Sequence, residues 1–87
     1  MKLQKNKTRV VLIPVDYLNS REVCESLENK GFDNETKLMK FINKELKRGD
    51  IDGSVLVYTL SGFMDEVNDQ NLEVLTEYFI SYVTLKE

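Results

Sequence analysis

The 87-residue sequence has no histidine and no tryptophan, and its only cysteine is Cys24. Without histidine the chain lacks the commonest general base of enzymes. A single cysteine cannot form an intramolecular disulfide, and zinc sites built from cysteine and histidine ligands are excluded. Cys24 itself has no histidine to activate it and lies among apolar positions, which is typical of an inert buried thiol. We therefore expect no enzyme activity, no cofactor and no metal site.

Long apolar runs are also missing. The apolar stretch over residues 10–15 is too short for the core of a signal peptide, contains Pro14 and is followed by Asp16. Nothing in the sequence is long enough to span a membrane. A hydrophobic content of 41% with 31% charged residues is that of an ordinary globular protein, and a chain of this length supports one core. We expect one cytoplasmic domain over residues 1–87, with a polar leader over 1–7 for which the sequence allows flexibility.

Three segments have the composition of strands. Residues 53–61 are apolar on both alternating sets of positions, which predicts a strand covered on two sides at the centre of the fold. Residues 8–17 and 78–85 are rich in β-branched and aromatic side chains. Pro14 cannot donate a ladder hydrogen bond, so the first strand either lies at an edge or stops pairing near Ile13. We favour the edge position.

Three helices are predicted between these strands. Asn19 and Glu22 have the spacing of a capping box at the start of the first helix, and Gly31 fits the left-handed position at its end. The second helix begins at Asp33 and Asn34 and runs to about residue 48, with an inward side formed by Leu38, Phe41, Ile42 and Leu46. A short third helix over 63–68 follows a Ser61 cap, and its inward positions are Phe63, Met64 and Val67. Residues 72–77 fit either a helix or a loop.

The predicted order of elements is therefore β-α-α-β-α-β. This order defines a single small α+β domain with a three-stranded sheet and helices packed mainly on one face. If the first two strands are parallel, the connection between them is right-handed. The strand order stays open at this point.

Charge is distributed unevenly along the chain. Residues 1–48 hold eleven Lys and Arg against seven Asp and Glu, a balance of +4, whereas residues 49–87 hold one against eight, a balance of −7. The basic side chains share one side of the second predicted helix; they are Lys37, Lys40, Lys44, Lys47 and Arg48. An acidic group near the third helix, Asp65, Glu66 and Asp69, has spacing that could hold a hard cation. Simple solvation explains both groups at least as well.

Nucleic-acid binding is one functional hypothesis. Lysines on a helix can follow phosphates, and exposed aromatic rings such as Tyr58, Tyr78 and Tyr82 can stack on bases. The net charge of −3 weighs against a dedicated nucleic-acid domain, which is normally basic. We keep weak nucleic-acid binding by the basic side of the second helix as the alternative hypothesis.

Protein interaction is the hypothesis that we favour. All three predicted strands are apolar on both faces, and the predicted helices supply enough apolar side chains for about one face. A monomer rarely exposes a large contiguous apolar patch. We expect a small non-catalytic interaction or regulatory module that binds protein, with a homodimer as the favoured form. The candidate interaction residues are the basic, acidic and tyrosine side chains named above.

Overall fold

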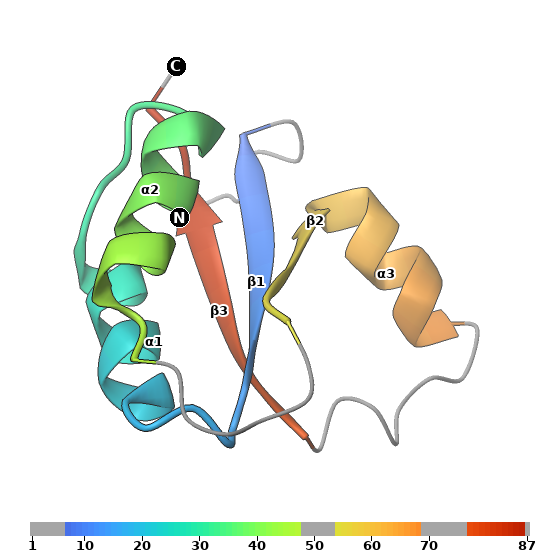
Figure 1. The fold of residues 1–87 in the computed structure, drawn as a ribbon. Helices are drawn as coiled ribbons and strands as arrows, with labels where there is room; N and C mark the ends of the chain where they lie inside the picture. The colour runs from blue at the N-terminus through green and yellow to red at the C-terminus, as the bar shows by residue number, and fades with distance from the viewer. Residues whose placement is uncertain (1–6, 48–53, 69–76, 87) are drawn as a thin grey trace.

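The computed structural model describes residues 7–47, 54–68 and 77–86 (Figure 1). Its elements are β1 (Thr8–Pro14), α1 (Ser20–Asn29), α2 (Glu35–Glu45), β2 (Leu56–Thr59), α3 (Leu60–Asn68) and β3 (Tyr78–Thr84). This order confirms the predicted α+β fold. The helices α1 and α2 lie on one side of the three-stranded sheet, and α3 lies on the other (Figure 1).

The sheet has the order β2-β1-β3, and β1 is antiparallel to both of its neighbours. The prediction that β1 lies at an edge is therefore wrong, as is the prediction that the segment containing β2 lies at the centre. Burial explains the error, because β1 is buried on both faces whereas β2 is only half-buried. The right-handed connection expected for parallel neighbours does not apply to β1 and β2. The two strands that run parallel are β2 and β3. They lie on either side of β1, and the connection between them contains α3.

Hydrogen-bond geometry explains how a proline fits in the central strand. The Val15 amide donates to the Glu77 carbonyl at 3.0 Å, and the Leu85 amide donates to the Lys7 carbonyl at 2.8 Å. Antiparallel strands exchange these hydrogen bonds at every second residue. The backbone N–H and C=O groups of odd-numbered β1 residues therefore point toward β3, and those of even-numbered residues point toward β2. The ladder with β2 ends at Leu12. The backbone nitrogen of Pro14 therefore points toward the β2 side, beyond the last residue pair between β1 and β2. Because no partner lies there, the missing N–H of the proline removes no ladder hydrogen bond.

Alternate residues of the strands build two separate clusters. On the side of α1 and α2, the buried cluster comprises Val11, Ile13, Tyr17, Val23, Cys24, Leu27, Phe32, Leu38, Ile42, Val83 and Leu85. On the side of α3, the buried cluster contains Val10, Leu12 and Phe63. We call these two sides of the sheet the α1/α2 face and the α3 face.

Both ends of α1 differ from the sequence prediction. Asn19 makes no capping hydrogen bond to α1. Its side-chain Nδ2 instead donates to the Glu45 carbonyl at 2.8 Å, and its Oδ1 accepts from the Lys47 backbone amide at 2.7 Å. Asn19 thus ties the start of α1 to the end of α2, so the capping-box prediction is wrong.

At the other end of α1, Lys30 is extended with φ −113°, and Gly31 does not adopt the left-handed conformation. Phe32 then forms a parallel bridge with Leu85, and the Lys86 amide donates to the Phe32 carbonyl at 2.9 Å. The predicted left-handed ending is therefore wrong, because the chain leaves α1 directly into an extended pairing with the end of β3.

The phase of α2 is as predicted. Asn34 caps the helix through the Lys37 amide at 3.0 Å, Leu38 and Ile42 are buried, and Phe41 and Leu46 are half-buried. The helix ends at Glu45, earlier than predicted, and Arg48 lies outside the described residues.

The helix α3 begins three residues earlier in the chain than the sequence predicts. The helix begins at Leu60, and the Thr59 hydroxyl accepts from the Gly62 amide at 3.1 Å, which is the interaction of a helix cap. Ser61 is exposed inside the helix, so its prediction as the cap is wrong. Residues 72–77, for which the sequence fits either a helix or a loop, lie outside the described residues as far as residue 76. Glu77 is in a turn.

Candidate functional site

The α3 face brings two of the three predicted tyrosines around one buried ring. Val10 lies in the middle of this face, and its cross-strand partners are Tyr58 on β2 and Tyr82 on β3. Phe63 of α3 is 4% exposed, and its ring centroid lies 6.3 Å from each of these two tyrosine rings. Tyr78 is further along β3, opposite Pro14. Phe63 thus attaches α3 to the sheet, together with the half-buried Leu60 and Val67 of the same helix.

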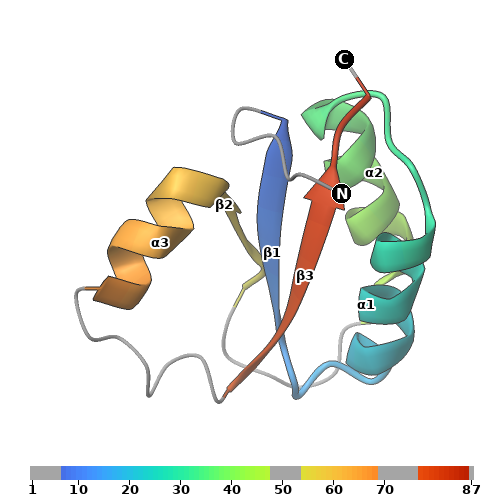
Figure 2. The ribbon, with the colours of Figure 1, turned by 180° about the vertical axis from the view of Figure 1, so that it is seen from behind.

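The cover of this face is incomplete. A helix with its side chains is about 10 Å wide and strands lie about 4.8 Å apart, so one helix covers about two strands. Figure 2 shows α3 next to β2, whereas α1 on the opposite face is next to β3. Accordingly, Tyr82 of β3 is 47% exposed. Met64 of α3 is 51% exposed, so its predicted inward position is wrong.

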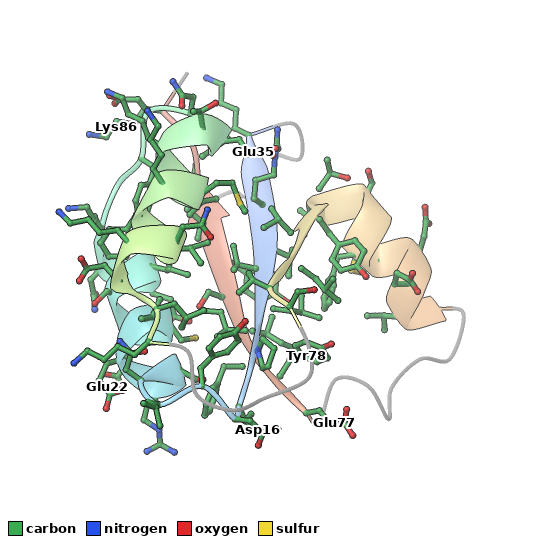
Figure 3. All side chains as sticks on the ribbon, viewed as in Figure 1. Asp16, Glu22, Glu35, Glu77, Tyr78 and Lys86 are labelled. Carbon is green, nitrogen blue, oxygen red and sulfur yellow. The ribbon has the colours of Figure 1, made fainter. Side chains whose placement is uncertain are left out.

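We define the open α3 face as four exposed or half-buried side chains, one from α3 and three from β3. They are Met64, Tyr78, Ile80 and Tyr82. The described charges on α3 and from Glu77 to Leu85 are all acidic. Asp65 and Glu77 are exposed and Glu66 is half-buried, and no Lys or Arg occurs in residues 54–68 or 77–85. Figure 3 shows Glu77 and Tyr78 together at one end of β3, with Lys86 near the other end. Asp69, the third member of the predicted acidic group, lies outside the described residues.

The predicted basic residues lie on the other side of the sheet. Lys37, Lys40 and Lys44 are exposed on α2, and Lys47 is exposed just after it. The Lys37 ammonium donates to the Asp33 carboxylate at 3.0 Å, and this hydrogen bond lowers the pKa of Asp33. Because α2 packs on the α1/α2 face, the lysines and the tyrosines do not form one continuous surface.

Cys24 has the surroundings of a structural thiol. It is 8% exposed, its Sγ lies 2.6 Å from the Ser81 Oγ, and the Ser81 hydroxyl donates to the Cys24 carbonyl at 3.2 Å. Burial raises the pKa of the thiol, and the carboxylates of Glu28 and Glu25 act in the same direction. The reactive thiolate form is therefore disfavoured. The contact between Cys24 and Ser81 joins α1 to β3.

A small hollow lies between the end of α2 and the start of β2. Its volume is about 170 Å³, and it is lined by Tyr17, Met39, Asn43, Leu46, Ser54 and Val55. Cavities that bind drug-sized ligands are usually about 300–1,000 Å³. The hollow is too small for such a ligand, and none of the described residues that line it is acidic or basic.

Other kinds of site are not assembled in the part of the chain that the structure describes. Within residues 7–47, 54–68 and 77–86, no three acidic, cysteine or histidine side chains are grouped so that they could hold a metal ion. In the same residues, no helix is both long and apolar enough to cross a membrane. The open α3 face is the exposed apolar surface that these residues do present.

Comparisons with protein-family models, curated proteins and solved structures found no significant match to this chain.

Sequence reasoning named the tyrosines but missed the residue that organises them. Phe63 was identified as an inward position of a helix, yet nothing in a linear sequence shows that its ring lies between strands on both sides of β1. The cap by Thr59 had a usable signal, because a threonine three residues before Gly62 has the normal spacing of a cap. The exposure of Met64 had no comparable signal.

Proposed function

We propose that this chain is a non-catalytic cytoplasmic protein-interaction module, and that its binding surface is the open α3 face. The partner in this proposal is a second copy of the chain, so that the module acts as a homodimer. The observation that carries the proposal is the exposure of Tyr82 (47%) and Met64 (51%) next to a buried aromatic cluster.

Physical arguments support this use of the surface. Complete burial of a large apolar side chain contributes roughly 1.5–3 kcal/mol relative to leaving it in water. Tyrosine and methionine are enriched at protein interfaces, where charged residues are depleted from the centre. The centre of the open α3 face has this composition, because Ile80 separates Tyr78 and Tyr82 without any charged neighbour on β3. A twofold dimer is the commonest way for a soluble chain to cover such a surface.

The proposal is tested by measuring the mass of the protein in solution. Light scattering or sedimentation over micromolar concentrations is expected to give a dimer for the natural sequence. Tyr82→Lys should give a monomer, because it places a charge at the centre of the interface. Since the Tyr82 ring also contacts the buried Phe63, circular dichroism of the same variant checks that it is folded. The matched control is Lys40→Glu on α2, which should remain dimeric. A monomer mass for the natural chain, or a dimer that tolerates Tyr82→Lys, would contradict the proposal.

The exposed side of α2 supports a second candidate function. Lys40, Lys44 and Lys47 are all exposed, which suits weak contacts with phosphates. Fluorescence anisotropy with single-stranded DNA or RNA tests this candidate. It predicts binding at low salt that decreases steeply as salt rises, and that is weakened by Lys40→Glu but not by Tyr82→Lys. A flat titration at low salt would eliminate it.

A further inference from the structure

The two edges of the sheet differ in how far other parts of the chain cover them. At the β3 edge, the Lys86 amide donates to the Phe32 carbonyl at 2.9 Å. Further along the same edge, the Cys24 Sγ lies 3.8 Å from the Ile80 carbonyl oxygen. The helix α1 and the chain that follows it therefore cover the β3 edge, and β2 forms the other edge (Figure 1).

The β2 edge has backbone groups that are available for a further strand. Leu56 and Tyr58 pair with the β1 residues whose backbone groups point toward β2. The N–H and C=O groups of Val57, which lies between them, therefore point away from β1. Among the described residues, none forms a backbone hydrogen bond with these groups. β2 also contains none of the charged or proline residues that often protect an edge strand from pairing.

The hollow between α2 and the start of β2 lies beside this edge. Its helix side is formed by Met39, Asn43 and Leu46. Its sheet side includes Val55, whose side chain shares the α1/α2 face with that of Val57. Its volume of about 170 Å³ is close to the roughly 150 Å³ of a cavity that holds one benzene molecule. One aliphatic side chain of a partner is therefore the size of occupant that fits.

Basic side chains border the helix side of the hollow. Lys40 follows Met39, which places it about 100° further round α2, and Lys47 directly follows Leu46. Both lysines are exposed, and neither forms an ion pair with a described carboxylate. The described charges of α3, on the other face of the sheet, are acidic. Carboxylates are therefore favoured on the α2 side of a bound segment and disfavoured on its α3 side.

We propose that the β2 edge binds an extended peptide segment of a partner protein, which joins the sheet as a strand antiparallel to β2. One aliphatic side chain of the segment lies opposite Val55 and enters the hollow. Acidic side chains two residues before and after it approach Lys40 and Lys47. Peptides often bind to an open sheet edge in this way, with main-chain hydrogen bonds for affinity and pockets for alternate side chains for specificity. This site is separate from the open α3 face, so the inference goes beyond the proposed function and does not require a dimer.

Antiparallel pairing determines which backbone groups of the peptide are used. The alternation of β2 turns the backbone groups of Val55 outward, like those of Val57. The peptide residue opposite Val55 therefore exchanges both hydrogen bonds with it and has its side chain on the same face. In a parallel arrangement, that peptide residue would turn its backbone groups away from β2. Because β2 has only four residues, the bonds are few and the complex is weak and transient.

NMR titration of the isotope-labelled full chain tests the location of the site. The probe is the peptide acetyl-Ser-Glu-Thr-Leu-Thr-Glu-Ser-amide, which has leucine for the hollow and glutamate two residues before and after it. The amide signals of Val57 and Asn43 should shift, and hydrogen exchange of the Val57 amide should slow. No shift up to about 1 mM peptide would overturn the inference. A peptide that shifts nothing, with single-stranded DNA shifting the signal of Lys40, would assign the lysines to nucleic acid instead.

Backbone methylation of the peptide tests strand addition without any change to the protein. Methylation of the leucine nitrogen removes one hydrogen bond to Val55 and should weaken binding about tenfold. Methylation of the nitrogen of the preceding threonine is the matched control, because that nitrogen points away from β2, and it should have little effect. A larger effect from the threonine than from the leucine would show that the antiparallel pairing is wrong.

Side-chain changes test the hollow and the charges. Replacing the peptide leucine by glycine should weaken binding at least about tenfold, because burial of an aliphatic side chain is lost. Lys40→Glu should weaken binding about two- to fivefold at low salt and less at high salt. Lys30→Glu at the end of α1 makes the same change of net charge and should leave binding nearly unchanged. Equal binding of the glycine peptide, or equal losses in the two lysine variants, would overturn the inference.

Discussion

The α1/α2 face and the α3 face are built from alternate residues of the same three strands, but they are covered to different extents. Among the described residues, eleven buried side chains form the cluster on the α1/α2 face and three form the cluster on the α3 face. In β1 itself the two faces are equivalent, because Val10, Val11, Leu12 and Ile13 are all at most 2% exposed. The difference therefore arises in the flanking strands and in the helices above them.

The comparison shows that an apolar pattern in a strand specifies which faces can be buried, but not what covers them. On the α1/α2 face, β3 presents the buried Ser81 and Val83 to α1. On the α3 face, the same strand presents Tyr82, which α3 leaves half in solvent. Among the described residues, α3 alone covers that face, next to β2 and β1, so variants on the two faces should behave differently.

The largest effect is expected on the α1/α2 face. Leu38 of α2 is fully buried, and Leu38→Ala should lower the free energy of unfolding by about 2–5 kcal/mol. The control Lys40→Ala, two residues away and exposed, should change it by less than about 0.5 kcal/mol. Urea denaturation followed by circular dichroism measures both. If the two variants were equally stable, our assignment of the buried side of α2 would be wrong.

A smaller and more local effect is expected on the α3 face. Phe63→Ala removes the buried side chain that α3, among its described side chains, places on the sheet. Truncation of a packed phenylalanine costs about 3–5 kcal/mol, but here the cost is limited by the free energy that docks α3. We expect the variant to lose less stability than that, with α3 detached and the rest still folded.

Hydrogen exchange distinguishes local from global loss in the Phe63→Ala variant. Amides of α3 should exchange rapidly, whereas amides of β1 and β3 should remain protected. Met64→Ala is the control on the same helix and should leave the exchange of the monomer unchanged. Uniform loss of protection across all elements would mean that α3 is as integral to the fold as α2.

Connections between elements should show the same asymmetry on a smaller scale. Asn19→Ala removes both hydrogen bonds that tie the start of α1 to the end of α2, and should cost about 1–2 kcal/mol. Thr59→Ala removes the single cap of α3, for which about 0.5–2 kcal/mol is usual. Thermal denaturation of the two variants compares them directly. Asn19→Asp should retain the bond from the Lys47 amide and fall between the natural chain and Asn19→Ala.

The sequence alone was sufficient for the order of elements and for the division of strand residues between two faces. Both follow from the local periodicity of apolar residues. On α2, for example, Leu38 and Ile42 have the predicted spacing and are buried. It was not sufficient for strand order. Pro14 does not force β1 to an edge, because the cost of a proline depends on whether a partner strand reaches that position, and the β2 ladder stops at Leu12. Pairing length is a tertiary property.

The candidate site was predictable in part for the same reason. That Tyr78, Ile80 and Tyr82 share one face follows from the alternation of β3. Their incomplete cover depends on where α3 is attached, which Phe63 determines through contacts with both Tyr58 and Tyr82. Asn19 illustrates the limit of local motifs, since its side chain has the spacing of a cap but bonds across 26 residues to Glu45.

The smallest effect on stability is expected from the exposed charged side chains of the α1/α2 face. Unlike the buried side chains, they contribute little to packing. Lys37 lowers the pKa of Asp33 through a 3.0 Å hydrogen bond, but both side chains are more than half exposed. A depressed folded-state pKa means that the contribution of Asp33 is present above its unfolded pKa of about 3.9 and is lost as the pH falls through the folded value. At neutral pH an exposed pair of this kind contributes little, so Lys37→Ala should leave the unfolding midpoint almost unchanged. In the same variant, NMR titration of the Asp33 carboxyl should show its pKa returning toward the ordinary range, whereas Lys44→Ala should leave it in place. An unchanged Asp33 titration in Lys37→Ala would show that the hydrogen bond is not populated in solution.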